Sequence, residues 1–297
     1  MSNLPEFERI KHITMTPGMK LIVMSDMHRG DGSGADDFIQ NSLIYRCALE
    51  YYLENGFTYI ELGDAEELWE NDNFDQIYIT YTPVYDLLAK FHDPDPEKTR
   101  YIKVWGNHDL YWKDHQDIYQ SLFPGIQIYE AILLNNTMLM IHGHQADPMC
   151  SGPVAAVSQF FVNHIWADLQ RGGVKDPTRA ATNPGLCNEV DERLHKWATP
   201  NGKGITTIIA GHTHRAVFEN LSLTERRYLE SRVKTEGVKI KHQPDGSYYN
   251  TGSCVHPLSI TGLEITFDGG HNPQLRLIEW GQATEGHALT IQRGEIS

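Results

Sequence analysis

Short apolar runs recur along the chain, and their pattern predicts the class of fold. Five of them are rich in Val, Ile, Tyr and Thr and mostly lack alternation: KLIVMS at 20–25, FTYIEL at 57–62, YIKVW at 101–105, TMLMI at 137–141 and ITTIIA at 205–210. Runs of this kind are typical of strands buried on both faces. Helix-like stretches lie between the first three runs, so we expect an α/β fold whose sheet is at least partly parallel.

Two helices are predicted between these strands. Residues 36–56 carry apolar residues at helical spacing and stop at Gly56, with Asp36 as the expected N-cap. Residues 74–92 form the second helix, and we expect a break near Pro83 because proline cannot donate a helix hydrogen bond.

Residues 146–200 do not follow this alternation of strands and helices. Two stretches in this segment, PVAAVSQFFVNHIWADLQ and LCNEVDERLHKWA, both have helical spacing. We interpret the segment as a helical insertion within a single domain of residues 1–297, with ordinary core helices as the alternative. Phe160, Phe161 and Trp166 could wall an apolar pocket or could simply be packed helix residues. Beyond residue 221, a charged stretch leads into SYYNTGSCVHPLSITGLEITF and QLRLIEW, which we expect to be strands of a second sheet. The last dozen residues are expected to be a tail or an edge.

Composition narrows the classes of protein that remain. The net charge of −14 disfavours binding to long nucleic acid, which requires clustered Lys and Arg. No apolar stretch approaches the length of a membrane span, and the N-terminus lacks the apolar core of a signal peptide. The four scattered cysteines form no C-x-x-C pair. We therefore expect a cytoplasmic protein without a membrane span; the sequence carries no signal for its oligomeric state.

Each apolar run ends in Asp, Asn or His, which a strand interior avoids. In open α/β sheets, ligands bind beyond the carboxyl ends of the strands. The five ends therefore describe one site that is assembled from five loops. In chain order they are Asp26-Met27-His28, Gly63-Asp64, Gly106-Asn107-His108-Asp109, His142-Gly143-His144 and Gly211-His212-Thr213-His214.

The residue types at these ends point to metal binding. Carboxylate, amide and imidazole groups without a thiolate suit Mn²⁺, Fe or Zn²⁺ at sites with open positions. Seven ligands are too many for one ion, whereas two ions that share a bridging carboxylate would use them all, and such pairs act in displacement at phosphorus. The seven candidates are Asp26, His28, Asp64, Asn107, His142, His212 and His214.

In this order, the motifs D-x-H, G-D, G-N-H-D, H-G-H and G-H-x-H resemble those of the calcineurin-like metallophosphoesterase superfamily. They span residues 26–214, and YYNTGSC at 248–254 resembles the strand that often follows G-H-x-H. The resemblance implies a four-layer αββα sandwich of two mixed sheets flanked by helices, with the helical insertion over the site. It also implies phosphoester hydrolysis by a hydroxide that bridges two divalent metal ions, with Mn²⁺ as the first expectation and Fe or Zn²⁺ as alternatives.

The same resemblance implies a role for each matched residue. One metal ion would be held by Asp26, His28 and His214. The second would be held by Asn107, His142 and His212, with Asp64 bridging the two ions.

Residues beside the ligands are expected to act on the substrate. His108 would stabilise the transition state or protonate the leaving oxygen, and Asp109 would orient its imidazole. His144 would support the ligands, contact substrate, or replace His142 as a ligand. Arg29 and Arg215 are candidates for binding a phosphate oxygen, with solvated loop arginines as the alternative.

The substrate is defined only by class. LGDAEELWE, GHTHR and an insertion before G-H-x-H resemble the branch that includes UDP-2,3-diacylglucosamine pyrophosphatase. That enzyme has arginine where this chain has His108, so its lipid substrate is not carried over. We expect hydrolysis of a phosphodiester or phosphoanhydride bond in a small phosphorylated molecule. A phosphomonoesterase or protein phosphatase is the alternative, and a non-catalytic scaffold is the contrasting class.

Overall fold

The computed structural model describes residues 4–34, 36–71, 73–148, 150, 184–198, 204–217, 247–270, 272–285 and 288–296. Their strands form two mixed sheets. The larger sheet contains, in spatial order, β12 (Ala288–Glu295), β11 (Gln274–Glu285), β10 (Ser259–Thr266), β2 (Lys20–Met24), β3 (Thr58–Leu62), β4 (Tyr101–Val104) and β5 (Ile128–Tyr129). The smaller sheet contains β1 (Ile10–Ile13), β6 (Ala131–Leu134), β7 (Met138–Ile141), β8 (Thr207–Ala210) and β9 (Ser247–Asn250).

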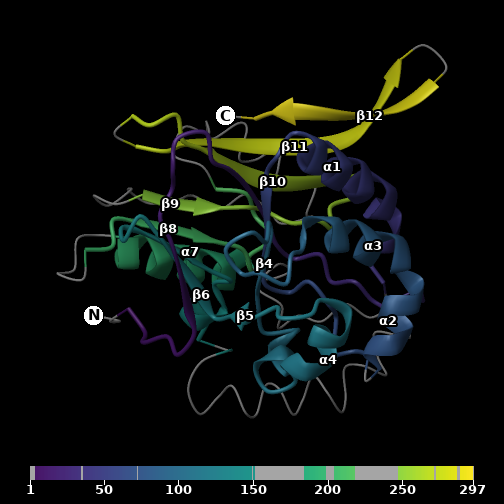
Figure 1. The fold of residues 1–297 in the computed structure, drawn as a ribbon, viewed down its shortest axis with the longest axis horizontal. Coiled ribbons are helices and arrows are strands. Elements are labelled where there is room, and N and C mark those ends of the chain that lie inside the picture. Colours follow the sequence, from purple (N-terminus) through teal and green to yellow (C-terminus); the bar gives the residue numbers. More distant parts are fainter. Residues whose placement is uncertain are drawn as a thin grey trace.

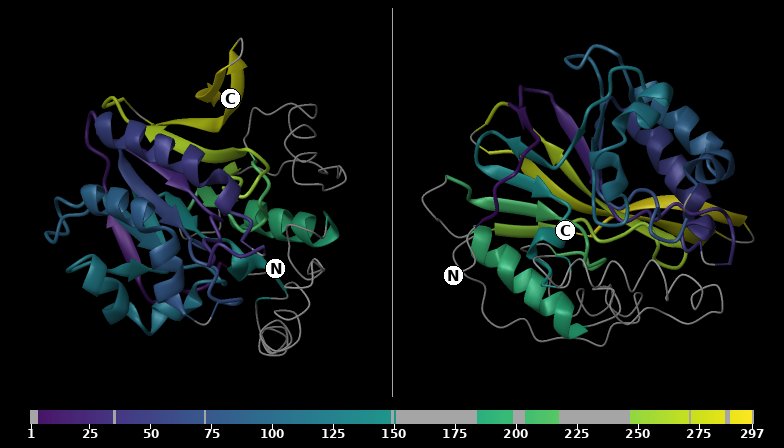
Figure 2. Two further views of the ribbon diagram at one scale, coloured as in Figure 1. Left: turned by 90° about the vertical axis from the view of Figure 1, so that its right-hand side faces the viewer. Right: turned by 90° about the horizontal axis from the view of Figure 1, so that it is seen from below.

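Helices cover the outer faces of both sheets. Figures 1 and 2 show one group of helices on one side of the sheets and α7 (Pro184–Ala198) on the other. The first group comprises α1 (Ser42–Glu54), α2 (Phe74–Thr80), α3 (Thr82–Phe91) and α4 (Gln116–Leu122). Three short 3-10 helices, η1 (Ile39–Asn41), η2 (Leu110–Lys113) and η3 (His144–Ala146), lie in the connections. Two mixed sheets flanked by helices confirm the predicted fold class.

Strand β2 shows why the predicted strands lack alternation. Its Leu21 and Val23 side chains join the core between the two sheets, whereas Ile22 and Met24 join the core beneath the α1–α4 helices. Because successive side chains of a strand point to opposite faces, an apolar residue is needed at every position when both faces are covered. On the far side, α7 packs Val190, Leu194 and Trp197 onto the outer face of the smaller sheet.

Strands β2, β3, β4 and β5 are parallel neighbours, so their carboxyl ends meet at one edge of the larger sheet. In the smaller sheet, β7, β8 and β9 are likewise parallel neighbours. The loops that follow β2, β3, β4, β7 and β8 hold the polar residues singled out above. The site is therefore built from two sheets, not from the single sheet that the five runs suggested.

The expectation that the C-terminal strands form a second sheet was wrong in part. β9 does lie in the smaller sheet, beside β8. β10, however, pairs antiparallel with β2, and β11 and β12 extend the same sheet to its edge. Periodicity alone predicts a strand but not its neighbour, and β10 joins β2 from more than 200 residues further along the chain.

The predicted helices are confirmed with adjusted ends. The break near Pro83 is present, since α2 ends at Thr80 and α3 begins at Thr82. Asp36 accepts the backbone N–H groups of Phe38 and Ile39 just before η1, but the N-cap of α1 is Asn41 and α1 begins at Ser42, so the prediction of Asp36 as the helix N-cap was wrong.

Of the 146–200 segment, α7 is a helix as predicted, whereas Phe160, Phe161 and Trp166 lie outside the described residues, as does the charged stretch from residue 221. Among the helices of the described residues, none is long and apolar enough to cross a membrane.

Candidate metal centre

The five loops bring all seven predicted ligands to one buried place. Each of these residues is at most 7% exposed, which is unusual for carboxylate and imidazole groups unless they are paired or bind a metal. The seven residues are Asp26, His28, Asp64, Asn107, His142, His212 and His214.

Asp26, His28 and His214 form the first group that could hold a metal ion. Their ligand atoms all lie within 4.8 Å of one another. His214 Nε2 is 3.2 Å from Asp26 Oδ1, and His28 Nε2 is 3.2 Å from His214 Nε2. Two imidazole nitrogens and one carboxylate oxygen therefore converge on a common point.

Asp64, His142 and His212 form a second group with the same spacing. Asp64 Oδ2 lies 3.0 Å from His142 Nε2 in this group and 3.7 Å from His28 Nε2 in the first. Its other oxygen, Oδ1, accepts the backbone N–H of His108 at 2.8 Å. One oxygen of Asp64 is thus held by the chain, while the other stands between the two groups.

Two buried polar atoms support the fit of this donor set to metal ions. Within the described residues, Asn107 Oδ1 is buried and has no hydrogen-bond partner, and His142 Nε2 is buried with no well-directed hydrogen bond, although Asp64 Oδ2 lies 3.0 Å away. Leaving such atoms unpaired costs free energy, so buried groups of this kind are normally satisfied by a partner. Two divalent cations would satisfy both, and the mixture of carboxylate, amide and imidazole suits Mn²⁺, Fe or Zn²⁺.

The backbone at the ligands is strained. Left-handed φ angles occur at eight described residues other than glycine, and five of the eight are candidate ligands: Asp26, His28, Asp64, His212 and His214. This conformation costs on the order of 1–3 kcal/mol per residue and persists only where the surroundings enforce it. The strain is concentrated where the side chains must converge.

The glycines of the motifs allow the loops to approach closely. A Cβ atom at Gly106 would overlap Asp64 Oδ1, and one at Gly211 would overlap Ser25 Oγ. At Gly63, a Cβ would lie 2.5 Å from His142 Cγ, and the φ of +86° already disfavours other residues. The glycines that precede Asp64, Asn107 and His212 are therefore required by packing, and Gly63 by its conformation as well.

The Nδ1 atoms of three candidate ligands are held by the chain. His28 Nδ1 donates to Glu67 Oε2 at 2.7 Å, and His142 Nδ1 donates to the Leu62 carbonyl at 3.0 Å. His214 Nδ1 lies 3.1 Å from Ser253 Oγ, whose own hydroxyl donates to the Asp26 carbonyl. Such contacts fix the tautomer and leave Nε2 as the ligand atom.

Charge in the site favours cations. Burial raises the pKa of Asp26, but His214 and His142 outweigh it and hold the pKa well below its usual range. Burial lowers the pKa of His28, yet the nearby Asp26 carboxylate, 3.9 Å away, and the hydrogen bond to Glu67 raise that pKa to about 10. The carboxylate is therefore ionised and His28 carries a proton, which a divalent cation would displace.

His108 lies beside the two groups, and its partner differs from the expected one. His108 Nδ1 donates to Glu67 Oε1 at 2.7 Å, and its ring stacks on Trp69 with centroids 4.1 Å apart. Asp109 instead accepts the backbone N–H groups of Gly106 and Ala65 and so joins two ligand loops. The expectation that Asp109 orients His108 is therefore corrected, because Glu67 occupies that position.

The two arginines expected to bind phosphate are also used elsewhere. Arg29 is fully buried and pairs with Glu61 at 2.8 Å and Glu66 at 2.6 Å. Arg215 is 4% exposed and pairs with Asp191 of α7. Neither guanidinium faces the metal ligands, so this geometry does not fit the predicted contact with substrate.

His144 stays next to the site without joining either ligand group. Its ring centroid lies 5.6 Å from that of His142 and 6.5 Å from that of His212. Burial lowers the pKa of His144 well below its usual value, and the neighbouring His142 lowers it further. His142, by contrast, belongs to the second group. The arrangement favours His142 as the ligand and leaves a neutral His144 beside it.

Sequence reasoning missed three residues that contact the ligands: Glu67, Asp147 and Ser253. Asp147 Oδ2 lies 2.9 Å from His212 Nε2. Glu67 had a readable signal, since it follows Asp64 by three residues in the same loop. Ser253 and Asp147 had none, because their proximity depends on how distant segments pack.

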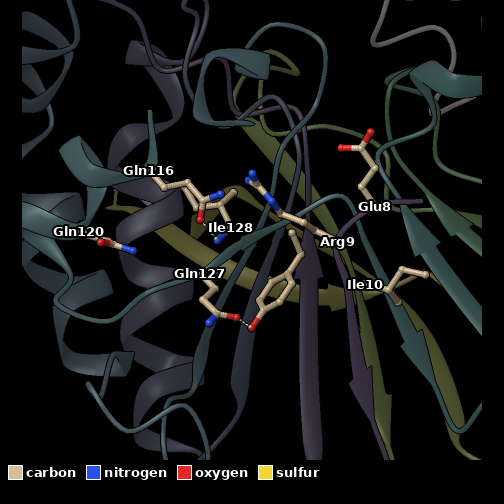
Figure 3. Close-up of a pocket in the computed structure, with 8 residues that line it drawn as sticks. Glu8, Arg9, Ile10, Gln116, Gln120, Gln127 and Ile128 are labelled. Carbon is tan, nitrogen blue, oxygen red and sulfur yellow. Dashed lines mark hydrogen bonds between the residues drawn. The ribbon is translucent and has the colours of Figure 1, made fainter. Parts of the chain in front are cut away.

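A separate cavity of about 480 Å³ lies away from these ligands (Figure 3). It is lined by Glu8, Arg9, Ile10, Gln116, Gln120, Gln127, Ile128 and Tyr129. Several of these polar groups are engaged with the chain, as Arg9 is with the Lys113 carbonyl and Tyr129 with Gln127. None of the candidate ligands lines it, so we do not assign it to the metal centre.

No protein-family model matches the chain, and no curated protein matches it. Among solved structures, it is similar to Vps29 complexed with zinc from Entamoeba histolytica, with 14% identity, a TM-score of 0.32, and coverage of 94% of this chain and 100% of that one. It is also similar to a protein serine/threonine phosphatase from Saccharomyces cerevisiae that resembles human phosphatase PP5, with 12% identity, a TM-score of 0.35, and coverage of 93% and 84%. Identities and TM-scores as low as these two carry no conclusion about the function of this chain.

Proposed function

We propose that this chain is a calcineurin-like metallophosphoesterase that hydrolyses phosphodiester or phosphoanhydride bonds of a small molecule. One observation carries the proposal. Two three-residue ligand groups lie side by side, and one oxygen of Asp64 is within 4 Å of an imidazole nitrogen from each. A pair of metal positions that share a carboxylate is the arrangement used for displacement at phosphorus.

In this proposal the chain holds one ion through Asp26, His28 and His214, and the other through Asn107, His142 and His212, with Asp64 shared. Two bound divalent cations would supply a hydroxide nucleophile near neutral pH and neutralise charge on the phosphoryl oxygens. The buried setting excludes water and strengthens these electrostatic interactions.

His108 is the residue we place against the substrate. Burial lowers the pKa of His108, with Glu67 and Asp64 opposing, so its imidazole is neutral at pH 7. Because Nδ1 donates to Glu67, Nε2 is left to contact a substrate oxygen. A neutral ring that donates from Nδ1 has a lone pair at Nε2, so in this role His108 first takes up a proton at Nε2 and then, as imidazolium, stabilises the transition state or gives that proton to the leaving oxygen.

The ion pairs of Arg29 and Arg215 favour a diester over a monoester as the substrate. A phosphomonoester carries a second negative charge, which enzymes commonly bind with guanidinium groups. Here the guanidinium groups of Arg29 and Arg215 are engaged by buried carboxylates. Among the described residues, neither guanidinium is then left for the substrate, and two metal ions as the positive charges of the site would suit a singly charged diester or an anhydride linkage.

The test is to measure initial rates of the Mn²⁺-loaded protein on bis(p-nitrophenyl) phosphate and p-nitrophenyl phosphate. We expect faster turnover of the diester, loss of activity with a chelator, and recovery when Mn²⁺ is restored. A preference for the monoester would replace the diesterase proposal with a phosphatase. Failure to turn over either compound, with two ions bound, would favour a non-catalytic scaffold.

Glu67→Ala is expected to impair the site more than His108→Ala. Glu67 holds two imidazoles at 2.7 Å each, that of a proposed ligand and that of His108. Removing an outer partner of a metal ligand costs about 10–100-fold in metal affinity or activity. We therefore expect Glu67→Ala to weaken Mn²⁺ binding and slow turnover, and His108→Ala to slow turnover with Mn²⁺ still bound. Metal titration followed by kcat measurement separates the two, and equal Mn²⁺ affinity in both variants would contradict the role of Glu67.

A further inference from the structure

Besides the two groups of the proposed metal pair and a group of His28, Asp64 and His108 that shares their residues, a further group of ligand atoms includes a cysteine and so has a different chemistry. The ligand atoms of Asp147, Cys150 and His212 all lie within 4.8 Å of one another. Asp147 Oδ2 is 2.9 Å from His212 Nε2. His212 therefore belongs to this group and to the second group of the metal pair.

The chain forms a tight turn that gathers these donors. The η3 helix ends at Ala146, and the Asp147 N–H donates to the His144 carbonyl at 3.0 Å. The Cys150 N–H then donates to the Asp147 carbonyl at 3.2 Å. Two donors separated by two residues on a turn is the spacing that zinc sites use repeatedly. Asp147 is 1% exposed and Cys150 is half-buried, so the donors are shielded yet not sealed from solvent.

The thiol changes the metal that such a group would select. Thiolate ligands favour Zn²⁺ over Mn²⁺, Mg²⁺ and Ca²⁺, which prefer oxygen donors. A carboxylate oxygen, an imidazole nitrogen and a thiolate sulfur, with water in the fourth position, form a common open tetrahedral zinc site. We infer that Asp147, Cys150 and His212 form a Zn²⁺ site that is separate from the proposed catalytic pair and competes with it for His212.

Sharing His212 has a consequence for activity. A Zn²⁺ ion held by Asp147 and Cys150 draws the imidazole of His212 from the second position of the pair. Occupation of this site then inhibits the Mn²⁺-loaded protein, and Cys150 is the residue that makes the inhibition selective for a thiolate-binding metal. This inhibitory effect rests on the proposed function, whereas the existence of the thiolate site does not.

Binding is tested with Co²⁺ as a spectroscopic probe of the full-length protein. Co²⁺ bound by a thiolate gives a near-ultraviolet charge-transfer absorption that oxygen and nitrogen ligands do not give. We expect this band in the wild type and in Cys47→Ser, a control at a half-buried cysteine on α1. We expect its loss in Cys150→Ser. Absence of the band in the wild type, or its persistence in Cys150→Ser, overturns the site without touching the proposed function.

Inhibition is tested by adding Zn²⁺ to the Mn²⁺-loaded protein during diester hydrolysis. We expect Cys150→Ser to keep the Mn²⁺-dependent rate and to raise the half-inhibitory Zn²⁺ concentration by at least about tenfold, the lower end of the loss seen when a partner of a metal ligand is removed. Cys47→Ser should match the wild type. Equal inhibition of Cys150→Ser and wild type, meaning that Zn²⁺ acts by entering the catalytic pair, overturns the regulatory inference.

Discussion

Asp64→Ala is expected to lower kcat/KM for the diester by at least about a thousandfold, because a shared metal ligand supports several kcal/mol of transition-state stabilisation and each 1.4 kcal/mol is tenfold in rate. Asp64 Oδ2 lies between the two ligand groups, 3.0 Å from His142 and 3.7 Å from His28. Removing it leaves the two proposed ions without their shared anion. The measurements are steady-state kinetics with Mn²⁺ and the number of ions bound per chain.

Two further variants test whether the charge of Asp64 and its position in the site cause this loss. Asp64→Asn retains an oxygen that can accept the His108 N–H but removes the charge, so its rate should fall between those of wild type and Asp64→Ala. Asp37→Ala removes an exposed carboxylate near the start of α1 and should leave turnover unchanged. Turnover of Asp64→Ala close to that of wild type would show that the metal pair is not the centre of the reaction.

The strands were predictable because a strand that is buried on both faces needs apolar residues at nearly every position, and such a run is visible in the sequence. All five apolar runs became strands, and each of them contributes to cores on its two sides. β1 and β5 contain no such apolar run, since β1 carries Lys11 and His12 and β5 has two residues. The apolar runs by themselves did not indicate which strands belong to which sheet; the two sheets were predicted from the motif resemblance, because strand pairing depends on contacts between segments far apart in the chain.

At the site, the sequence predicted which residues converge but not which ones support them. Ligand positions follow strand ends, a local property, and the structure brings ligand atoms of six of them into two groups, with Asn107 buried next to His108, whose backbone N–H donates to Asp64. Arg29 and Arg215 were predicted to face the substrate because they follow ligands. In the structure both side chains instead form buried ion pairs, Arg29 with Glu61 and Glu66 and Arg215 with Asp191. His28 and His214 have left-handed φ angles, so the direction of the side chain that follows each of them could not be derived from strand alternation.

Beneath the site lies a fully buried ionic cluster that ties three ligand loops together. Lys103 Nζ lies 2.8 Å from Glu66 and 3.0 Å from Glu61, and Arg29 pairs with the same two carboxylates. Trp112 Nε1 and the Tyr85 and Tyr101 hydroxyls donate to them as well. Because Arg29 adjoins His28 and Glu66 is near Asp64 in the next loop, the cluster supports the positions of the ligands above it.

Lys103→Met is expected to reduce the free energy of unfolding by about 3–5 kcal/mol, the cost of leaving a buried ion pair with one partner missing. Methionine matches the length of lysine but leaves Glu61 and Glu66 with only Arg29 as a cationic partner. Urea-induced unfolding of the metal-free protein measures the change without interference from metal binding. Lys98→Met is the matched control, since Lys98 is 71% exposed and pairs only with Asp95 at the surface among the described residues. A loss in Lys103→Met no larger than in this control would mean that water or a rearranged Arg29 replaces the ammonium group, and that the cluster does not fix the ligand loops.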